Sequence, residues 1–75
     1  MTNARMYELA RNAVIEYEHI QPDDENQPDV LWVGGVMESR RAVAWYMGKL
    51  YMVRHNTGTG ETAVDAYIKE EVNRG

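Results

Sequence analysis

Apolar residues recur at spacings of three and four over residues 4–20, which is the period of an amphipathic helix. The residues that share this stripe are Met6, Leu9, Ala10, Ala13, Val14, Tyr17 and Ile20. Asn3 is a suitable N-cap residue just before the stripe. The Gln21-Pro22 step ends it, because proline lacks a backbone N–H and disfavours helical angles in the residue before it. The pattern predicts a helix over residues 4–20.

Two contrasting segments follow. Residues 21–29 (QPDDENQPD) contain two prolines, four carboxylates and no apolar side chain, which predicts a solvated acidic loop. Residues 30–37 (VLWVGGVM) are apolar, rich in β-branched side chains and interrupted by Gly34-Gly35. A short apolar run with glycines predicts a strand with a kink or a close backbone approach.

Residues 40–55 (RRAVAWYMGKLYMVRH) fit two periods. The helical stripe would contain Val43, Tyr46, Met47, Leu50 and Val53, with Gly48 in its interior at a cost of about 1 kcal/mol. A hairpin over residues 41–55 would instead use Gly48-Lys49 as a two-residue turn with glycine first, as in type II′. Its cross-strand pairs would include Tyr46 with Tyr51 and Trp45 with Met52. We favour the hairpin, because it explains Gly48 and pairs aromatic with branched residues.

The last segment has a loop composition followed by an apolar stripe. Residues 56–60 (NTGTG) predict a loop, and Thr59 can cap a helix over residues 60–73. The stripe of that helix would contain Val64, Tyr67, Ile68 and Val72. The expected fold is therefore α+β in a single domain over residues 1–75, with about three antiparallel strands packed by an N-terminal and a C-terminal helix. The alternative is an all-α three-helix domain in which residues 39–54 are helical.

The length and composition of the chain suggest that it gains stability by binding a partner. The chain has 75 residues, of which 44% are hydrophobic and 27% charged, as in ordinary globular domains. So short a chain buries only about 60% of the surface that its unfolded form exposes. With no cysteine, disulfides and cysteine-based zinc sites are excluded, so self-association as a homodimer or target binding is the remaining source of stability. We expect no signal peptide and no membrane span, and a cytoplasmic location by default.

Charge is distributed unevenly along the chain. Residues 1–37 hold seven acidic and two basic side chains, whereas residues 38–75 hold five acidic and six basic ones. The acidic half should repel polyanions. One hypothesis is that it mimics nucleic acid and binds the basic groove of another protein, through an acidic patch composed of Glu16, Glu18, Asp23, Asp24, Glu25 and Asp29.

The sequence contains only weak matches to metal-binding, nucleotide-binding and catalytic motifs. An EF-hand loop starting at Asp23 would need glycine and glutamate where Pro28 and Gly34 stand. Residues 58–63 (GTGETA) match the spacing G-x-G-x-x-A of a pyrophosphate loop before a helix, but too little chain follows for the rest of a dinucleotide fold. His19 and His55 have no sequence relation to Ser39, the only serine. We therefore predict no catalytic residue, no cofactor and no metal, and a protein that is not an enzyme.

Basic residues are interleaved with aromatic ones over residues 40–54, which is the composition of a platform for single-stranded nucleic acid. A sequence pI near 5.0 opposes that use. The stronger hypothesis starts from an excess of bulky groups: a hairpin here would be apolar on both faces, and two helices can cover only one. We predict that the uncovered face carries an aromatic patch that binds protein, with the residues Trp45, Tyr46, Tyr51, Arg41 and Arg54.

The expected function is thus non-enzymatic protein binding, by self-association or by docking on a larger macromolecule. In size and charge the chain is similar to phage or mobile-element inhibitors of host enzymes, and this similarity is compositional. Single-stranded nucleic-acid binding through residues 40–54 and acidic nucleic-acid mimicry are the alternatives. No membrane partner is expected.

Overall fold

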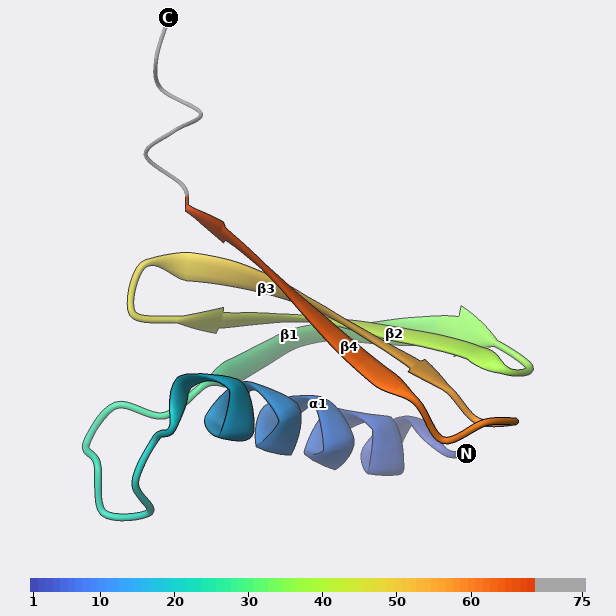
Figure 1. Cartoon of the computed structure of the whole chain (residues 1–75), viewed down its shortest axis with the longest axis horizontal. Helices are drawn as coiled ribbons and strands as arrows, with labels where there is room; N and C mark the ends of the chain where they lie inside the picture. The colour runs from blue at the N-terminus through green and yellow to red at the C-terminus, as the bar shows by residue number, and fades with distance from the viewer. Residues whose placement is uncertain (69–75) are drawn as a thin grey trace, which may run out of the picture.

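The described part of the chain, residues 1–68 of a computed structural model, holds one helix followed by four strands (Figure 1). In chain order the elements are α1 (Asn3–Glu18), β1 (Asp29–Val36), β2 (Ser39–Tyr46), β3 (Lys49–Asn56) and β4 (Thr62–Ile68). The strands form one antiparallel sheet in the order β1-β2-β3-β4, so each pairs with the next along the chain. The prediction of an α+β fold with a small sheet is confirmed, and the all-α alternative is wrong.

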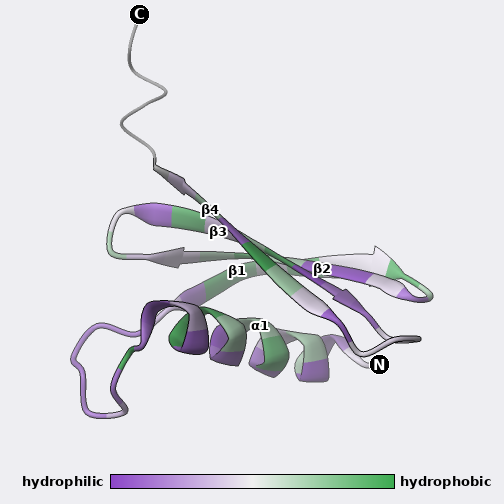
Figure 2. Cartoon of the chain, in the orientation of Figure 1, coloured by the Kyte–Doolittle hydropathy of each residue, from purple (hydrophilic) through white to green (hydrophobic). Residues whose placement is uncertain are grey.

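α1 lies across one face of the sheet, as Figure 1 shows. Met6, Ala10 and Val14 are fully buried and recur every four residues, so they lie on one side of the helix. The N-terminal helix predicted for residues 4–20 is confirmed by an observed helix over Asn3–Glu18. The connection from α1 to β1 is hydrophilic along most of its length (Figure 2).

Both ends of α1 have identifiable caps. Thr2, rather than Asn3, is the N-cap, and its hydroxyl accepts a hydrogen bond from the backbone N–H of Arg5 at 3.2 Å. The Asn3 side chain instead accepts a hydrogen bond from the guanidinium of Arg40. His19 ends the helix in the left-handed conformation, with φ of 58°, and its N–H bonds back to the last turn.

The two faces of the sheet differ in what lies against them. We call the face that packs against α1 the covered face; at its centre lie Ala42, Ala44, Tyr51 and Val53, all nearly or fully buried. We call the other the open face. The two alanines have short side chains and let the helix approach the strand closely. Residues that alternate with these along each strand point to the open face.

The hairpin of β2 and β3 turns one residue earlier than predicted. Tyr46 pairs with Lys49, so the turn is Met47-Gly48 rather than Gly48-Lys49. Met47 and Gly48 have φ of 52° and 80°, and a turn with positive φ at both central residues is the type I′ arrangement that suits the twist of a hairpin. The pairing is therefore Trp45 with Leu50, not Trp45 with Met52.

The predicted C-terminal helix is wrong over the residues that the structure describes. Thr62–Ile68 is strand β4, in which Val64 pairs with Val53 and Ala66 with Tyr51. The apolar residues that suggested a helix also fit an alternating pattern, and pairing supplies hydrogen-bond partners that the free edge of β3 would otherwise lack. The rest of the predicted helix, residues 69–73, lies outside the described residues.

The loop between β3 and β4 is organised by one side chain. The Asn56 Oδ1 atom accepts hydrogen bonds from the backbone N–H groups of Gly58 and Thr59, at 2.8 and 3.0 Å. Gly60 follows with φ of 81°, a conformation that favours glycine. The glycines of the G-x-G-x-x-A sequence therefore form a turn that leads into strand β4. No helix N-terminus is present at Gly60 to receive a pyrophosphate.

Candidate functional site

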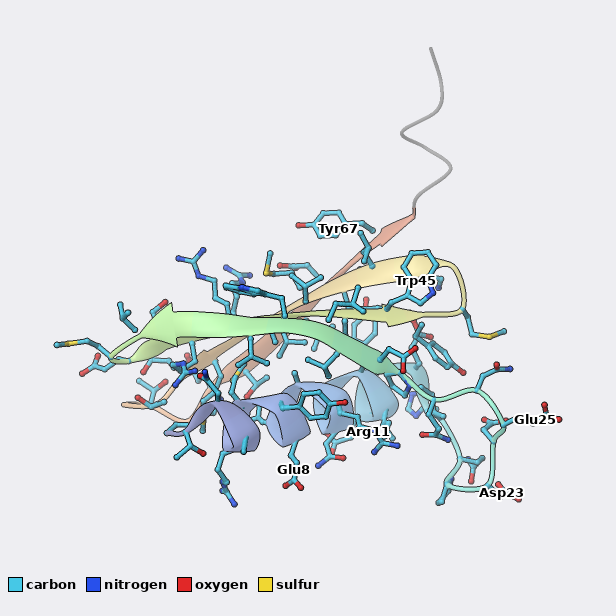
Figure 3. All side chains as sticks on the ribbon, turned by 180° about the vertical axis from the view of Figure 1, so that it is seen from behind. Glu8, Arg11, Asp23, Glu25, Trp45 and Tyr67 are labelled. Carbon is cyan, nitrogen blue, oxygen red and sulfur yellow. The ribbon has the colours of Figure 1, made fainter. Side chains whose placement is uncertain are left out.

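The open face carries a patch of bulky apolar side chains. The register aligns two rows across the sheet. One row is Trp32, Val43, Met52 and Asp65, and the next is Asp29, Trp45, Leu50 and Tyr67. Figure 3 shows Trp45 and Tyr67 on the side of the sheet away from α1. Trp32 is 51% exposed and Tyr67 56% exposed. Within residues 1–68, no element packs over this face.

Trp32 is held in place by a bulge and a glycine. The pairing of β1 with β2 shifts between Val30 and Trp32, so Leu31 is an extra residue and points outward, 61% exposed. A Cβ atom at Gly34 would lie 2.3 Å from the Cζ2 atom of Trp32, so the indole ring lies directly on the glycine backbone. A side chain at position 34 would displace the ring. The glycine therefore positions a large aromatic surface on the open face.

Two arginines border the apolar rows at one end. Arg41 and Arg54 pair across β2 and β3, next to Gly34 on one side and Ala63 on the other. The Arg54 guanidinium lies 3.0 Å from the carboxylate of Asp65, with both side chains about half exposed. An exposed ion pair of this kind contributes about 0–1 kcal/mol to stability. Asp29 lies in the second apolar row, at the edge of the sheet. The open face thus has an apolar centre and a charged margin.

The five residues of the predicted aromatic patch are divided between the two faces. Trp45, Arg41 and Arg54 lie on the open face, whereas Tyr46 and Tyr51 lie on the covered face. Tyr51 is 1% exposed and cannot contact a partner. Neighbouring residues in a strand point to opposite faces, so Trp45 and Tyr46 cannot share a surface. The sequence hypothesis missed Trp32. Its position in a predicted strand, two residues before the pair Gly34-Gly35, was the feature that could have identified it.

Tyr51 instead takes part in a polar cluster at the end of α1. Its hydroxyl donates a hydrogen bond to the carboxylate of Glu18, and Lys49 Nζ lies 3.6 Å from the same oxygen. Its ring meets that of Tyr17 edge-on, with centroids 6.1 Å apart. Burial, followed by the neighbouring Glu18 carboxylate, raises the pKa of the Tyr51 phenol. This cluster fastens the helix to β3.

The predicted acidic patch is distributed over several elements. Glu16 and Glu18 are on α1, Asp23, Asp24 and Glu25 are in the loop, and Asp29 begins β1. Figure 3 shows Asp23 and Glu25 on a loop that extends away from the sheet. Gln27 braces this loop, because its side-chain amide donates to the carbonyl oxygens of Gln21 and Asp24 at 3.0 and 3.1 Å. Glu18 is engaged with Tyr51, so it is not a free member of the patch.

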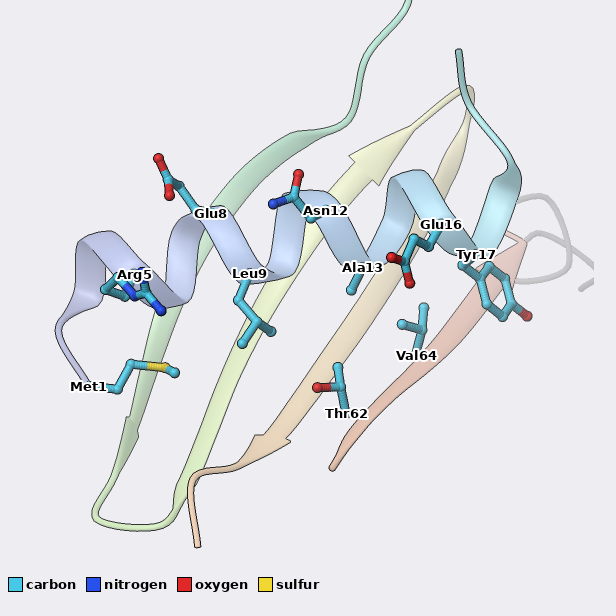
Figure 4. Close-up of a pocket in the computed structure, with 10 residues that line it drawn as sticks. All are labelled: Met1, Arg5, Glu8, Leu9, Asn12, Ala13, Glu16, Tyr17, Thr62 and Val64. Atoms are coloured by element: carbon cyan, nitrogen blue, oxygen red, sulfur yellow. The ribbon is translucent and has the colours of Figure 1, made fainter. Parts of the chain in front are cut away.

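A groove of about 650 Å³ runs between α1 and β4 (Figure 4). Leu9, Ala13 and Val64 form its apolar part, while charged residues such as Arg5 and Glu16 stand along the helix above it. The groove exists because α1 lies mainly over β1 and β2 and leaves part of β4 uncovered. It is shallow and lies on the side of the sheet opposite the open face.

Arg40 is a buried cation that sequence analysis did not single out. It is 8% exposed, and its guanidinium donates to the carbonyl oxygens of Gly34 and Met1, at 3.0 and 2.6 Å, and to the Asn3 side chain. It pairs with no carboxylate among residues 1–68. Arg40 lies two residues before Ala42 and four before Ala44, so in a strand all three side chains lie on the same face. This spacing was the sequence feature that could have placed Arg40 on the covered face. Arg40 therefore joins the start of α1 to the sheet.

The histidines and the serine do not form a recognisable catalytic arrangement. His55 and Ser39 line one hollow of about 530 Å³ at the end of the sheet, but the Nδ1 atom of His55 is hydrogen-bonded to the hydroxyl of Thr62 at 2.8 Å. His19 caps α1. Across residues 1–68, no group of three or more histidine, aspartate or glutamate side chains is arranged to hold a metal ion.

The helix in the described part of the chain is not long and apolar enough to cross a membrane. Comparison with protein-family models, curated proteins and solved structures finds no match to this chain.

Proposed function

We propose that this chain is a non-enzymatic protein-binding module whose contact surface is the open face of the sheet. The observation that carries the proposal is a set of bulky apolar side chains on a face that no described element covers: Trp32, Val43, Trp45, Leu50, Met52 and Tyr67. Contiguous exposed apolar patches on small proteins are characteristic of interaction sites.

The composition of the open face agrees with that of known interfaces. Tryptophan, tyrosine and arginine supply most of the binding energy in protein complexes, because they bury a large area at a small entropic cost. Here Trp32 and Trp45 lie among apolar neighbours, and Arg41 and Arg54 stand at the margin. An apolar centre with a polar rim is the usual arrangement. Trp32 replaces Tyr51 among the anchors that we propose.

The open face is also preorganised. Val43, Trp45, Leu50 and Met52 lie on the two central strands, which are paired on both sides. The Trp32 ring is held against Gly34. Side chains that are already fixed lose little freedom on binding, so more of the contact energy becomes affinity.

Single-stranded nucleic acid is the second candidate for the same surface. Aromatic rings on a four-stranded sheet with arginines beside them could stack bases and meet phosphates. Asp29 and Asp65 on the same face and a formal net charge of −4 disfavour this partner.

A larger host macromolecule, of the kind that phage inhibitors bind, fits the protein-binding proposal.

The proposal is tested by affinity capture from the lysate of the native host with three immobilised proteins: the wild-type chain, Trp45→Thr and Tyr7→Thr. Tyr7 is a matched control, since it is an exposed aromatic residue on α1. We expect proteins that are retained by the wild type and by Tyr7→Thr but lost with Trp45→Thr. Equal retention by all three would contradict the proposal.

Two further arms of the experiment separate the alternatives. Charge reversal of Asp23 and Asp24 together should leave the retained proteins unchanged, whereas an acidic mimic would lose them and would show steep salt dependence. Retention of the wild-type chain on single-stranded DNA at moderate salt, lost in Arg41→Ala, would favour the nucleic-acid candidate instead.

A further inference from the structure

The charge on the open face differs from that of the chain as a whole. The chain has a formal net charge of −4, but the charged side chains that the register places on the open face are Arg41, Arg54, Asp29 and Asp65, which balance. The acidic excess lies on α1 and on the loop that follows it. Two copies of this chain can therefore bring their open faces together without net repulsion, although the whole molecules repel weakly.

The open face has enough area for a stable contact. Four strands about 4.8 Å apart, each about eight residues long, span a flat area of about 500 Å². Two such faces bury at least about 1,000 Å² in total, and protruding side chains add to this, which reaches the range of specific interfaces. A second copy also offers a matching shape, since twisted sheets pack face to face with their strands about 30° apart.

We infer that the occupant of the open face is a second copy of this chain, related by a two-fold axis that lies between the two sheets and runs across the strands. This inference rests on the proposed function and names its partner. The resulting assembly has four layers: the two sheets in the middle and one helix on each outside surface.

The arginines select this axis. An axis parallel to the strands would leave every row opposite itself, so Arg41 of each copy would lie over Arg54 of the other, with all four arginines at the same end of the interface. An axis across the strands reverses the order of the rows. It brings the apolar rows of the two copies together and moves the two arginine rows to opposite ends of the interface. There each arginine row extends toward the end of the second copy that carries Asp29.

The first test is the molar mass of the full chain in solution, by light scattering and sedimentation equilibrium. We expect about 17 kDa, twice the 8.6 kDa of one chain, at about 10–100 μM, since interfaces of this size dissociate at micromolar concentration or below. Met52→Lys should raise the dimer dissociation constant about thirtyfold or more. Tyr7→Lys, on the outside surface, should leave it unchanged, and far-ultraviolet circular dichroism confirms that both variants fold.

The second test measures the orientation of the two copies. The chain has no cysteine, so Ser39→Cys introduces a single site for a spin label, at the end of β2 beyond the apolar rows. With the axis across the strands, the two labels should lie more than about 25 Å apart, whereas an axis along the strands would place them closer than about 20 Å. A short distance overturns the proposed arrangement.

The outcomes separate this inference from the function on which it rests. A wild-type chain that stays at 8.6 kDa at all concentrations, yet captures a protein through Trp45, overturns the dimer and leaves the proposed function in place. A monomer that captures nothing overturns both. A dimer that Met52→Lys does not weaken has its contact elsewhere, which overturns this inference. The proposed function then depends on the capture experiment with Trp45→Thr alone.

Discussion

The two faces of strand β2 hold apolar side chains of different size, and the helix covers the face with the smaller ones. On β2 the covered face has Ala42 and Ala44, whereas the open face has Val43 and Trp45. A helix packs closely against small side chains and fills the space with its own, as Met6 does. No described element covers the bulky residues on the other side, and we propose that a partner does. On this strand the small residues mark the contact with the helix, and the large, half-buried residues mark the face on which we propose a contact with a partner.

The largest difference between the faces should appear when a methionine is truncated on each. Met6→Ala removes a fully buried side chain and should lower the free energy of unfolding by about 2–5 kcal/mol at every protein concentration. Met52→Ala should have an effect that grows with protein concentration, because the proposed second copy adds contacts to this half-buried side chain. Urea unfolding at two concentrations measures both. Equal, concentration-independent effects would remove the distinction between the faces.

The neighbouring arginines provide the next comparison. Arg40→Leu deletes three hydrogen bonds that join the start of α1 to the sheet, so it should cost about 2–3 kcal/mol of stability. Arg41→Leu, one residue along but on the open face, should change stability of the isolated chain by less than about 0.5 kcal/mol. Thermal unfolding of the dilute proteins compares the two. If the variants were equally stable, Arg40 would have no anchoring role.

Tyr51→Phe tests the polar cluster on the covered face. Loss of the hydroxyl that donates to Glu18 should cost about 1 kcal/mol near neutral pH. Because burial raises the pKa of this phenol above its ordinary value near 10, the folded chain holds the proton more tightly than the unfolded chain does. That stabilisation is present below about pH 10 and is lost as the pH rises further. The pH dependence of unfolding should therefore be less steep above pH 10 in Tyr51→Phe, and an unchanged slope would contradict this explanation.

The smallest expected effect is at the β2–β3 turn. Met47 has φ of 52°, and asparagine is preferred over methionine before glycine in a type I′ turn. Met47→Asn should therefore raise stability by about 0.5–1 kcal/mol, with no effect on the open face. Thermal unfolding measures the change. A loss of stability would mean that the turn residues are not Met47 and Gly48.

Much of the fold follows from local patterns. The helical stripe of α1 and the strand character of the central segment can be read from residues close together in the sequence. The structure of Thr62–Ile68 cannot, because Val64, Tyr67 and Ile68 suit either period and the pairing with β3 decides between them. That pairing is a long-range contact, and a local pattern does not contain it.

The candidate site was predicted only in part, for a related reason. The apolar excess of the central hairpin was visible, but both of its faces are apolar, so alternation alone does not say which face the helix covers. The sequence hypothesis combined Trp45 with Tyr46 and Tyr51, which the pleat places on opposite faces. The presence of Ala42 and Ala44 was the available signal for the covered face. Arg40, in phase with these alanines, would then have been expected beneath the helix.

Tryptophan fluorescence provides the most direct measurement of the open face, because both tryptophans of the chain, Trp32 and Trp45, lie on it. We predict that diluting the wild-type protein from about 100 μM to well below its dissociation constant shifts the emission to longer wavelength and increases quenching by acrylamide, as the indoles become exposed to water. The same spectrum should be seen in Met52→Lys at any concentration. Emission typical of exposed indole at every concentration of the wild type, in the absence of any other protein, would contradict the burial of this face between two copies.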